Sequence, residues 1–433
     1  MNIGDPERGS ALVAVLLVAT LIGTLIGVIV SASVVERRII IDDIQKWKAW
    51  YAAEAGLHVA IAASRSSLPG ETVSISDPGG TWEARAMPYG AYMLIESVGR
   101  VGRQNTGLRG WVGTSLVFDA AIISGHDAVS LTIAEETVIR GDIYAGQAGV
   151  IVEGHLEEGP IGSARSGPVH QGVVHLVPSP RLPPIPPSRI PESRMMVRNL
   201  TQLGVPPTRF EGGTTIKVDD LAVGRAIFAE GDLFLDCEGR PLPDGSIILS
   251  TGRIQLRGYT GGRHVLLVGD EGVDIGPGRA TLHAISRGHL RIRSGAVLDI
   301  PSTATVADSS GQLTIDGTIR GAAVVGGLSL SLPDPVVASA PALRLGESAI
   351  VEGVVASARP CLPLGRVEGT LMCSAFLSDS DGRLRSARLD RTTIDLPSRH
   401  DGFVGPSLLG PNDRLILYGQ EAIPVDKLVM FRD

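Results

Sequence analysis

The feature that most constrains this chain is a run of 26 residues near its N-terminus, Ser10 to Val35, that contains no charged side chain and is mostly apolar. At a rise of about 1.5 Å per residue, a helix of this length measures about 39 Å, which exceeds the ~30 Å hydrocarbon core of a bilayer. The run therefore predicts a transmembrane helix.

A cleaved secretory signal is the alternative interpretation of the same run. Ser31-Ala32-Ser33 has the small-x-small pattern of a cleavage site. Against this interpretation, the apolar run is longer than the core of such a signal. The nine-residue leader before it also carries two acidic residues and one basic residue, Asp5, Glu7 and Arg8.

Helical periodicity continues past the apolar run. Apolar or small residues recur at spacings of 4, 3, 4 and 4. This pattern predicts one helix from about residue 11 to about residue 64, whose second half packs on a domain or on neighbouring helices. Pro69 and Gly70 then end it. The recurring residues, called here the predicted stripe, are Ile40, Ile44, Trp47, Tyr51 and Ala55.

Two segments of this region resemble known protein families. Arg8-Gly9-Ser10-Ala11-Leu12, followed by a long apolar helix, resembles the class III leader of type IV pilins and pseudopilins. Glu36-Arg37-Arg38 and Trp50-Tyr51-Ala52-Ala53-Glu54-Ala55-Gly56-Leu57 resemble the N-terminal segment of the PilX family of minor pilins. The resemblance covers residues 8–64.

The resemblance implies a processing site and a set of partners. Prepilin peptidase would cut after Gly9 and methylate the new N-terminal Ser10. The helix would then assemble with other pilins or pilus assembly proteins through Glu36, Arg37, Arg38, Trp50, Tyr51 and Glu54. The implied location is the inner membrane, with a single span and the body in the periplasm, on the cell surface or in the pilus.

The sequence departs from the major-pilin pattern at Ala14, the fifth mature position, where a glutamate is usual. A carboxylate in lipid must be paired, and its usual partner is a neighbouring subunit's N-terminal amine. The departure favours a minor or tip component. More Lys and Arg follow the apolar run than precede it, against the positive-inside rule, so the orientation is taken from the resemblance.

The rest of the chain is glycine-rich and β-rich. Residues 65–433 hold 49 of the 54 glycines, and short β-branched runs alternate with glycine-containing breaks. Gly231, Gly252, Gly272, Gly288 and Gly311 are separated by 21, 20, 16 and 23 residues. Such spacing is typical of a parallel β-solenoid, whose coils must stack to bury their apolar faces. The fold class is therefore α+β, mostly β: a long helix followed by a right-handed parallel β-helix, with an irregular β-sandwich as the alternative.

Four segments share an aliphatic residue, a charged residue and then a glycine, and they start at Ile139, Val152, Ile319 and Val351. These four segments, together with the proline-rich stretch after residue 177, suggest how the chain divides into domains. A short helix is also expected over 192–203. The expected segments are a leader (1–9), the pilin-like helix (10–64, with the span at 10–35), β-hairpins or a meander (65–118), a first solenoid part (119–177), a Pro-rich linker or strap (178–207), the main solenoid (208–374) and a C-terminal cap (375–433).

Composition excludes a nucleic-acid surface built on basic grooves and stacking rings. The formal net charge is −7 and aromatic residues make up 4% of the chain. Of the three cysteines, Cys361 and Cys373 enclose an eleven-residue loop and are a candidate disulfide, in keeping with the C-terminal loops of many pilins. Two buried thiols are the alternative, and Cys237 is expected to be a lone buried thiol.

Catalysis and metal binding have weak signals. Polysaccharide lyases share β-helix architecture, and six aspartates are candidates for a Ca²⁺ site: Asp232, Asp236, Asp270, Asp274, Asp299 and Asp316. Their spacing does not repeat like a ligand set, and Asp beside Gly is ordinary in turns. His264, His283 and His289 lack an HxH, HExxH or CxxC context, and no phosphate loop is present. We expect no metal, no cofactor and a role in assembly; an anchored solenoid that binds glycan or protein and a lyase-like enzyme are the alternatives.

Overall fold

The computed structural model describes residues 6–66, 73–114, 119–125, 129–134, 136–153, 169–177, 185, 190–202, 205–221, 226–326, 340–380, 383–399, 403, 405–409, 414–417 and 422–424. The chain forms two compact units. The first, called here the helix unit, comprises Met1–Val59, Ile75–Ala84 and Glu96–Leu108. The second, the solenoid unit, comprises Ala60–Ser74, Arg85–Ile95 and Arg109–Asp433.

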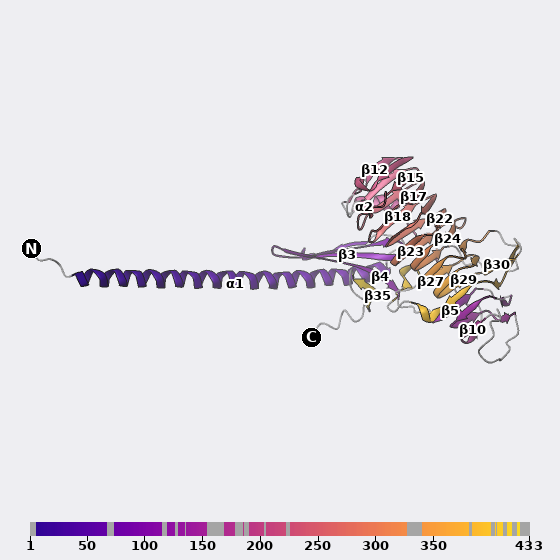
Figure 1. The fold of residues 1–433 in the computed structure, drawn as a ribbon, viewed down its shortest axis with the longest axis horizontal. Coiled ribbons are helices and arrows are strands. Elements are labelled where there is room, and N and C mark those ends of the chain that lie inside the picture. Colours follow the sequence, from indigo (N-terminus) through magenta and orange to yellow (C-terminus); the bar gives the residue numbers. More distant parts are fainter. Residues whose placement is uncertain are drawn as a thin grey trace, which may run out of the picture. The chain divides into compact units, whose positions relative to one another are not determined.

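One helix, α1 (Pro6–Ser66), runs without a break through the apolar N-terminal region (Figure 1). Its 61 residues contain no proline after Pro6, so no backbone N–H is lost inside the helix. The long helix expected over residues 11–64 is therefore confirmed. It is the one described helix that is long and apolar enough to cross a membrane.

The second half of α1 packs on β-strands within the helix unit. Ala49 and Ala53 are fully buried, and Gly99 of a neighbouring strand lies so close that a Cβ there would meet the Ala49 carbonyl oxygen at 1.9 Å. Gly56 similarly lies against Trp82. The absence of side chains at these glycines allows the helix and the strands to approach closely. The strands, which lie in the order β1-β2-β3-β4, are β1 (Val73–Ser76), β2 (Trp82–Tyr89), β3 (Tyr92–Val101) and β4 (Gln104–Thr114).

The solenoid unit is a stack of parallel β-coils, about ten turns long (Figure 1). A sheet of 16 strands forms one side and a sheet of eight strands another. The predicted β-solenoid is therefore confirmed and the β-sandwich alternative is wrong, while the handedness of the coils stays a prediction. The eight-stranded sheet contains β13 (Thr214–Lys217), β15 (Leu233–Asp236), β17 (Arg253–Arg257), β19 (Gly272–Ile275), β22 (His289–Ile292), β24 (Gln312–Ile315), β26 (Leu343–Leu345) and β28 (Cys361–Pro363).

The larger sheet carries the repeated motif seen in the sequence. Its strands are β5 (Ala120–Ser124), β7 (Val138–Arg140), β8 (Asp142–Ala145), β10 (Val169–Gln171), β11 (Val174–Leu176), β12 (Thr208–Glu211), β14 (Ala226–Glu230), β16 (Ile247–Ser250), β18 (Val265–Gly269), β20 (Gly278–Ala280), β21 (Leu282–Ser286), β23 (Ala296–Val306), β25 (Thr318–Val325), β27 (Ile350–Ser357), β29 (Arg366–Cys373) and β33 (Thr393–Asp395).

A column of glycines forms one corner of the coils. Gly321, Gly353 and Gly369 occupy the same position in neighbouring strands and have φ of +145°, +142° and +143°. A Cβ on Gly353 would meet the carbonyl oxygen of Gly321 at 2.0 Å. Both the positive φ and the close approach require glycine, which explains why the motif repeats a glycine after a charged residue.

Aliphatic side chains stacked from coil to coil fill the interior. The residue two positions before each corner glycine points inward, and Ile319, Val351 and Val367 are in register and fully buried. Because each coil is too thin to bury its apolar face alone, this stack supplies the stability of the unit. In the recurring sequence pattern, the aliphatic residue thus marks the inward position and the glycine marks the corner.

The order of the coils in space differs from their order in the chain. Proceeding through the large sheet, β12 lies at one end, and β29 and β33 lead to β7 and β10 at the other. One coil is built from two distant parts of the chain, because β29 pairs with β33 through Val367 and Ile394 and with β5 through Leu371 and Ile122. The strands β5, β7, β8, β10 and β11 therefore stack on the C-terminal end of the main solenoid.

Two described parts of the chain beyond β11, Ile185 and the region that begins at Ile190, lie on the main solenoid. The carbonyl oxygen of Ile185 lies beside Gly326, and the backbone N–H and hydroxyl of Ser193 donate to Asp270 at 2.9 and 2.6 Å. Helix α2 (Ser193–Gln202) matches the helix expected over 192–203 and buries Met196 and Leu200. Ile185 and α2 therefore lie on the main solenoid, and the linker or strap over 178–207 stays a prediction.

The remaining strands complete the edges of the solenoid unit. Three further strands, β32 (Arg388–Leu389), β6 (Leu131–Ile133) and β9 (Val150–Val152), form a small parallel sheet. The others are an antiparallel pair, β30 (Leu377–Ser380) with β31 (Arg383–Ser386), and three strands that join the sheet of β4, namely β34 (Gly405–Pro406), β35 (Arg414–Leu417) and β36 (Ala422–Pro424).

Candidate assembly helix

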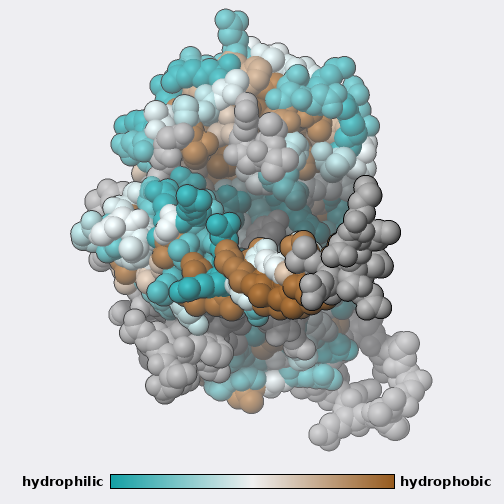
Figure 2. All heavy atoms as spheres, turned by 90° about the vertical axis from the view of Figure 1, so that its left-hand side faces the viewer, coloured by the Kyte–Doolittle hydropathy of each residue, from teal (hydrophilic) through white to brown (hydrophobic). Residues whose placement is uncertain are grey.

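The first half of α1 presents an apolar surface on all sides. Figure 2 looks along the helix from its N-terminal end and shows brown, hydrophobic side chains along it. No part of its most apolar window is buried within the structure, although its mean hydropathy is 2.8. Large apolar side chains that are about half exposed or more follow one another from Val13 to Ile44: Val13, Val15, Leu16, Leu17, Val18, Leu21, Ile22, Leu25, Ile26, Val28, Ile29, Val30, Val34, Val35, Ile39, Ile40, Ile41 and Ile44.

The hydroxyl groups in this region donate to the helix itself. Thr20 donates to the carbonyl oxygens of Leu16 and Leu17 at 2.8 and 2.9 Å, and Thr24 donates to Leu21 at 2.8 Å. Ser31 and Ser33 donate to carbonyl oxygens four residues earlier, both at 3.0 Å. Because their protons are already bonded, these side chains are far less costly to place in an apolar surrounding.

The second half of α1 has two distinct faces. Ala49, Ala53 and Leu57 are buried within the unit. The predicted stripe does not form this buried face: Ile40, Ile44, Trp47 and Tyr51 are each at least half exposed. The second half of α1 therefore packs on the chain's own strands as expected, but through its small residues and Leu57, and the apolar stripe is not the face that packs. The stripe is left open for another molecule.

An aromatic cluster lies on the open side of the helix. The Trp50 and Tyr51 rings are 5.3 Å apart in an edge-to-face arrangement, and Trp47 lies 6.3 Å from Trp50. Trp47 and Tyr51 are 61% and 54% exposed. Large, rigid, amphipathic rings of this kind favour membrane interfaces and protein contacts, where one side is apolar and the other is hydrated.

The residues of the predicted processing and assembly sites lie along α1. Gly9 and Ser10 fall within the helix, in its first turns. Ala14, Glu36, Arg37 and Arg38 are exposed and lie outside the buried face. Glu54 is half-buried, beside the buried face. The helix thus brings the predicted assembly residues onto one continuous element.

The candidate disulfide partners are free thiols in this structure. Cys361 and Cys373 are fully buried at the ends of β28 and β29, as is Cys237 elsewhere. Burial raises the pKa of the Cys373 thiol well above its usual value, and a hydrogen bond with Cys361 adds to the increase. The two sulfurs are therefore neighbours, and their disulfide stays a prediction.

The aspartates proposed for a lyase site are bonded within the solenoid. Asp232 accepts the backbone N–H of Arg253 at 2.8 Å, and Asp236 that of Glu238 at 3.1 Å. Asp270 holds Ser193 of α2. The remaining three each pair with an arginine of a neighbouring coil: Asp274 with Arg293, Asp299 with Arg279 and Arg320, and Asp316 with Arg291. Across the described residues, no group of three or more His, Cys, Asp or Glu side chains could hold a metal ion.

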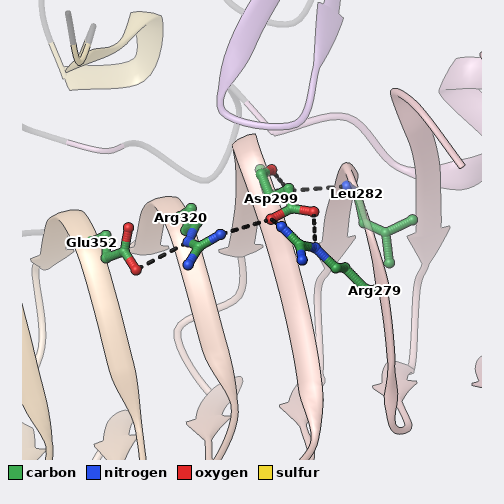
Figure 3. Close-up of polar contacts among 6 residues, drawn as sticks. Arg279, Leu282, Asp299, Arg320 and Glu352 are labelled. Atoms are coloured by element: carbon green, nitrogen blue, oxygen red, sulfur yellow. Dashed lines mark hydrogen bonds and ion pairs between the residues drawn. The ribbon is translucent and has the colours of Figure 1, made fainter. Parts of the chain in front are cut away.

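Figure 3 shows the longest of these ion-pair rows. Arg279 and Arg320 approach Asp299 at 2.7 and 3.1 Å, and Arg320 also approaches Glu352 at 3.0 Å. Two members of the row, Arg320 and Glu352, are the charged residues before corner glycines Gly321 and Gly353. The row joins successive coils and leaves no carboxylate of the set without an arginine, so it has a structural role and lacks the arrangement of a catalytic pair.

A buried aromatic cluster in the solenoid unit contains two histidines. The imidazoles of His264 and His283 both pack against the indole of Trp111, with ring centroids 4.9 Å apart in each case. The hydroxyl of Tyr89 donates to the carbonyl oxygen of His264 at 2.6 Å. His283 also lies 3.2 Å from the Thr303 hydroxyl. These histidines therefore hold β2 and β4 residues against the solenoid sheet.

Burial governs the titration of both histidines. It lowers the pKa of His264 to about 4, with a further contribution from Arg109 that Asp244 opposes and a smaller one from Arg263. It lowers the pKa of His283 well below its usual value, and His264 adds to this. Both imidazoles are therefore neutral at pH 7.

Two features of these sites were not found from the sequence. The buried face of α1 includes small residues such as Ala49 and Ala53, which hydropathy periodicity detects poorly, although Ala49, Ala53, Leu57 and Ile61 do recur every four residues. The histidine cluster joins residues separated by more than 150 positions, so no local pattern marks it.

Comparison with known proteins gives little. No family model matches the chain, and no curated protein matches it. Among solved structures, the competence-associated pilin ComZ from Thermus thermophilus is 12% identical over 88% of this chain and 96% of its own, with a TM-score of 0.24. A superposition this poor carries no structural argument, so the function must be inferred from the residues themselves.

Proposed function

We propose that this chain is a minor pilin or pilin-like component of a type IV pilus or a related filament or secretion system, similar to the PilX family, and that it acts by assembly. The observation that carries the proposal is α1, a continuous helix whose apolar surface is exposed from Val13 to Ile44 and remains open to Tyr51 on one side. A filament subunit needs such an element.

The physical argument concerns the transfer of this helix. Its first half suits lipid, because it is uncharged from Ser10 to Val35 and its hydroxyls are bonded internally. Packing among other apolar helices exchanges one apolar surrounding for another, so the transfer out of the membrane costs little in burial. The open stripe on the second half offers the same neighbours a continuing apolar contact outside the membrane.

The leader supports the same proposal. Cleavage after Gly9 by prepilin peptidase would remove the charged side chains of Asp5, Glu7 and Arg8 and leave a helix that begins at Ser10 and has no charged side chain up to Val35. Without those charges the N-terminal end can enter an apolar bundle. The enzyme would methylate Ser10, as in the family that the leader resembles.

The position of the subunit follows from Ala14. A helix with alanine at the fifth mature position has no carboxylate to pair with a neighbour's N-terminal amine. The body is also large, with 369 residues after residue 64. Both features favour a tip or initiation role over a repeated shaft subunit, with the body outside the cytoplasm and the helix in the inner membrane before assembly.

Processing tests the proposal. Gly9→Ala should leave a precursor that migrates more slowly than the wild type on a gel, whereas Gly4→Ala, within the same leader, should be processed normally. Loss of pilus assembly in a strain that carries only Gly9→Ala would then support the role. Equal mobility of wild type and Gly9→Ala would contradict the pilin-like assignment and favour a permanently anchored solenoid.

A further inference from the structure

The outward face of the eight-stranded sheet carries four arginines on two of its coils. Arg253 and Arg257 lie on β17, Arg291 lies on β22, and Arg293 follows β22 directly. All four are exposed and alternate with buried aliphatic residues. Strand β19 lies between β17 and β22 and pairs with both. The four residues, called here the arginine face, therefore border one strand, in a chain whose formal net charge is −7.

Strand β19 adds little negative charge between these arginines. Its one charged residue is Asp274, which Arg293 binds through two N–H groups, one of them at 2.8 Å. Gly272, in register with Arg253, and Gly276, directly after the strand, carry no side chain. The sheet surface between the two arginine-bearing strands is therefore low and close to neutral.

The stems of Arg253 and Arg257 lie against β19. The Cγ atom of Arg253 is 3.3 Å from the position that a Cβ on Gly272 would take, and the Cγ atom of Arg257 is 3.5 Å from the corresponding position on Gly276. Long cationic side chains bury their methylene groups along a surface in this way and keep the charged end in water. The low surface of β19 therefore seats both stems, while the guanidinium groups stay exposed.

The arginine face keeps an unbalanced positive charge. Within the described residues neither Arg253 nor Arg257 has an ion pair, and Arg257 donates to the Gln255 amide oxygen at 3.2 Å. Arg291 lies 3.4 Å from Asp316, but its side chain is 56% exposed, and an ion pair this open contributes little in water. Three of the four arginines can therefore bind an anion without losing a strong internal pair.

The spacing of the arginine face suits a chain of negative charges. Arg253 and Arg257 are four residues apart on one strand, or about 13 Å, and β17 and β22 are two strand spacings apart, or about 10 Å. A single small anion would meet only part of this area. Because the guanidinium fork binds carboxylates through two parallel hydrogen bonds, a polymer with repeated carboxylates can meet the whole face.

The composition of the same sheet favours a glycan over a nucleic acid. Its eight strands contain one aromatic ring, that of Phe234 on β15, whereas single-stranded nucleic acids bind on several stacked rings. The Gln255 amide and the Thr314 hydroxyl occupy outward positions and can exchange hydrogen bonds with sugar hydroxyls. Asp236, the outward carboxylate of β15, already accepts the Glu238 backbone N–H at 3.1 Å. The face thus combines anion-binding groups with groups that bind hydroxyls.

We propose that the arginine face binds an acidic polysaccharide, whose carboxylates lie on Arg253, Arg257 and Arg291 and whose hydroxyl groups meet the neighbouring amide and hydroxyl side chains. Residues 226–326, which contain β17, β19 and β22, are described without a gap, so the strands that form the face are complete. Because the site lies in the solenoid and uses no residue of α1, the proposal does not depend on the pilin-like assignment.

Fluorescence anisotropy with the full chain in nanodiscs tests the proposal. The probe is fluorescein-labelled polygalacturonate, and its uncharged counterpart is fluorescein-labelled dextran. We expect saturable binding of polygalacturonate that weakens as the NaCl concentration rises, and no binding of dextran. The double variant Arg253→Gln with Arg257→Gln should bind polygalacturonate at least about tenfold more weakly than the wild type. The matched control, Arg103→Gln with Arg209→Gln, removes the same charge from exposed arginines outside this sheet and should bind as the wild type does.

Four outcomes would overturn the proposal. The first is no saturable binding of polygalacturonate to the wild type, and the second is binding of dextran with the same affinity. The third is equal affinity of the two double variants for polygalacturonate. The fourth is a short duplex DNA that binds the wild type as tightly as polygalacturonate and loses affinity equally in Arg253→Gln with Arg257→Gln, because the partner would then be a nucleic acid. Thermal unfolding curves verify that both double variants are folded, as expected for side chains that are exposed.

Discussion

Acid should weaken the solenoid unit through its two buried histidines. In the unfolded chain an imidazole takes up a proton near pH 6.5, whereas His264 in the folded protein does so only near pH 4. Between these values the unfolded state binds more protons than the folded state. Stability is therefore fully present above pH 6.5 and is lost as the pH falls toward 4.

The size of the effect follows from this interval. The pKa of His264 is about 2.5 lower in the folded than in the unfolded state, so its protonation lowers the free energy of unfolding by about 3 kcal/mol once both states are protonated. At pH 5 the loss is about 2 kcal/mol. His283 changes stability in the same direction, since burial among Trp111, Tyr89 and His264 opposes its protonation. The pKa of about 4 for His264 already includes the effects of nearby charges: Asp244 raises it, and Arg109 and Arg263 lower it.

The assay is urea unfolding of the full chain at pH 7.5 and pH 5.0, followed by tryptophan fluorescence. Between pH 7.5 and pH 5.0, the free energy of unfolding of the wild type should fall by about 2 kcal/mol more than that of His264→Gln, because glutamine takes up no proton in this range. His289→Asn is the matched control, since His289 is exposed, and it should lose as much as the wild type. Equal losses in wild type and His264→Gln would refute the reasoning. The difference between variants separates the histidines from carboxylates, which titrate in all of them.

Three further predictions, with five substitutions, test the glycine corners, the two faces of α1 and its apolar half. Gly353→Ala should lower the stability of the solenoid unit in thermal unfolding by more than about 2 kcal/mol, because φ is +142° and the new Cβ would lie 2.0 Å from a carbonyl oxygen. The control Gly239→Ala, where φ is +78° and no atom lies close to the new Cβ, should lower stability by about 1 kcal/mol. Ala53→Leu should overpack the helix unit and lower its free energy of unfolding by about 1–3 kcal/mol. Ile44→Lys, on the exposed face, should leave unfolding of the unit unchanged but reduce incorporation of the protein into filaments in a cell-based assembly assay. Leu21→Arg should raise the free energy of membrane insertion by about 3 kcal/mol, so less protein should be found in the membrane fraction and more should be degraded. An unchanged amount of protein in the membrane fraction would contradict the membrane assignment.

The sequence predicted the solenoid because corner glycines and inward aliphatic residues are set by each coil's own geometry. The pattern at Ile319-Arg320-Gly321 and Val351-Glu352-Gly353 marks stacked corners, and the copies at Val367-Glu368-Gly369 and at Gly172 extend it. The copy at Val152 lies in the small sheet with β6 and is not part of this column.

The order of the coils was beyond sequence reasoning. All coils present similar inward and backbone surfaces, so nothing local indicates that β5 and β33 combine into one coil next to β29. Register between distant strands depends on contacts such as Leu371 with Ile122, which a single sequence does not reveal.

The candidate assembly helix was predicted in length but not in the direction of its faces. Periodicity favoured Ile44, Trp47 and Tyr51 as the packed stripe because they are large and apolar. The close approach of Gly99 instead requires small residues at this point of the helix, so Ala49 and Ala53 are buried there while Ile44, Trp47 and Tyr51 stay exposed. Shape complementarity, not hydropathy, decided which face packs within the unit.

The most direct test of the account is the mass of the N-terminal peptide of the wild-type protein extracted from membranes of cells that express prepilin peptidase. The account predicts a peptide that begins at Ser10 and carries one methyl group on its amino nitrogen. An intact Met1 would contradict it by indicating a permanently anchored solenoid. A peptide that begins at Val34 would contradict it by indicating a secretory signal cleaved after Ser33.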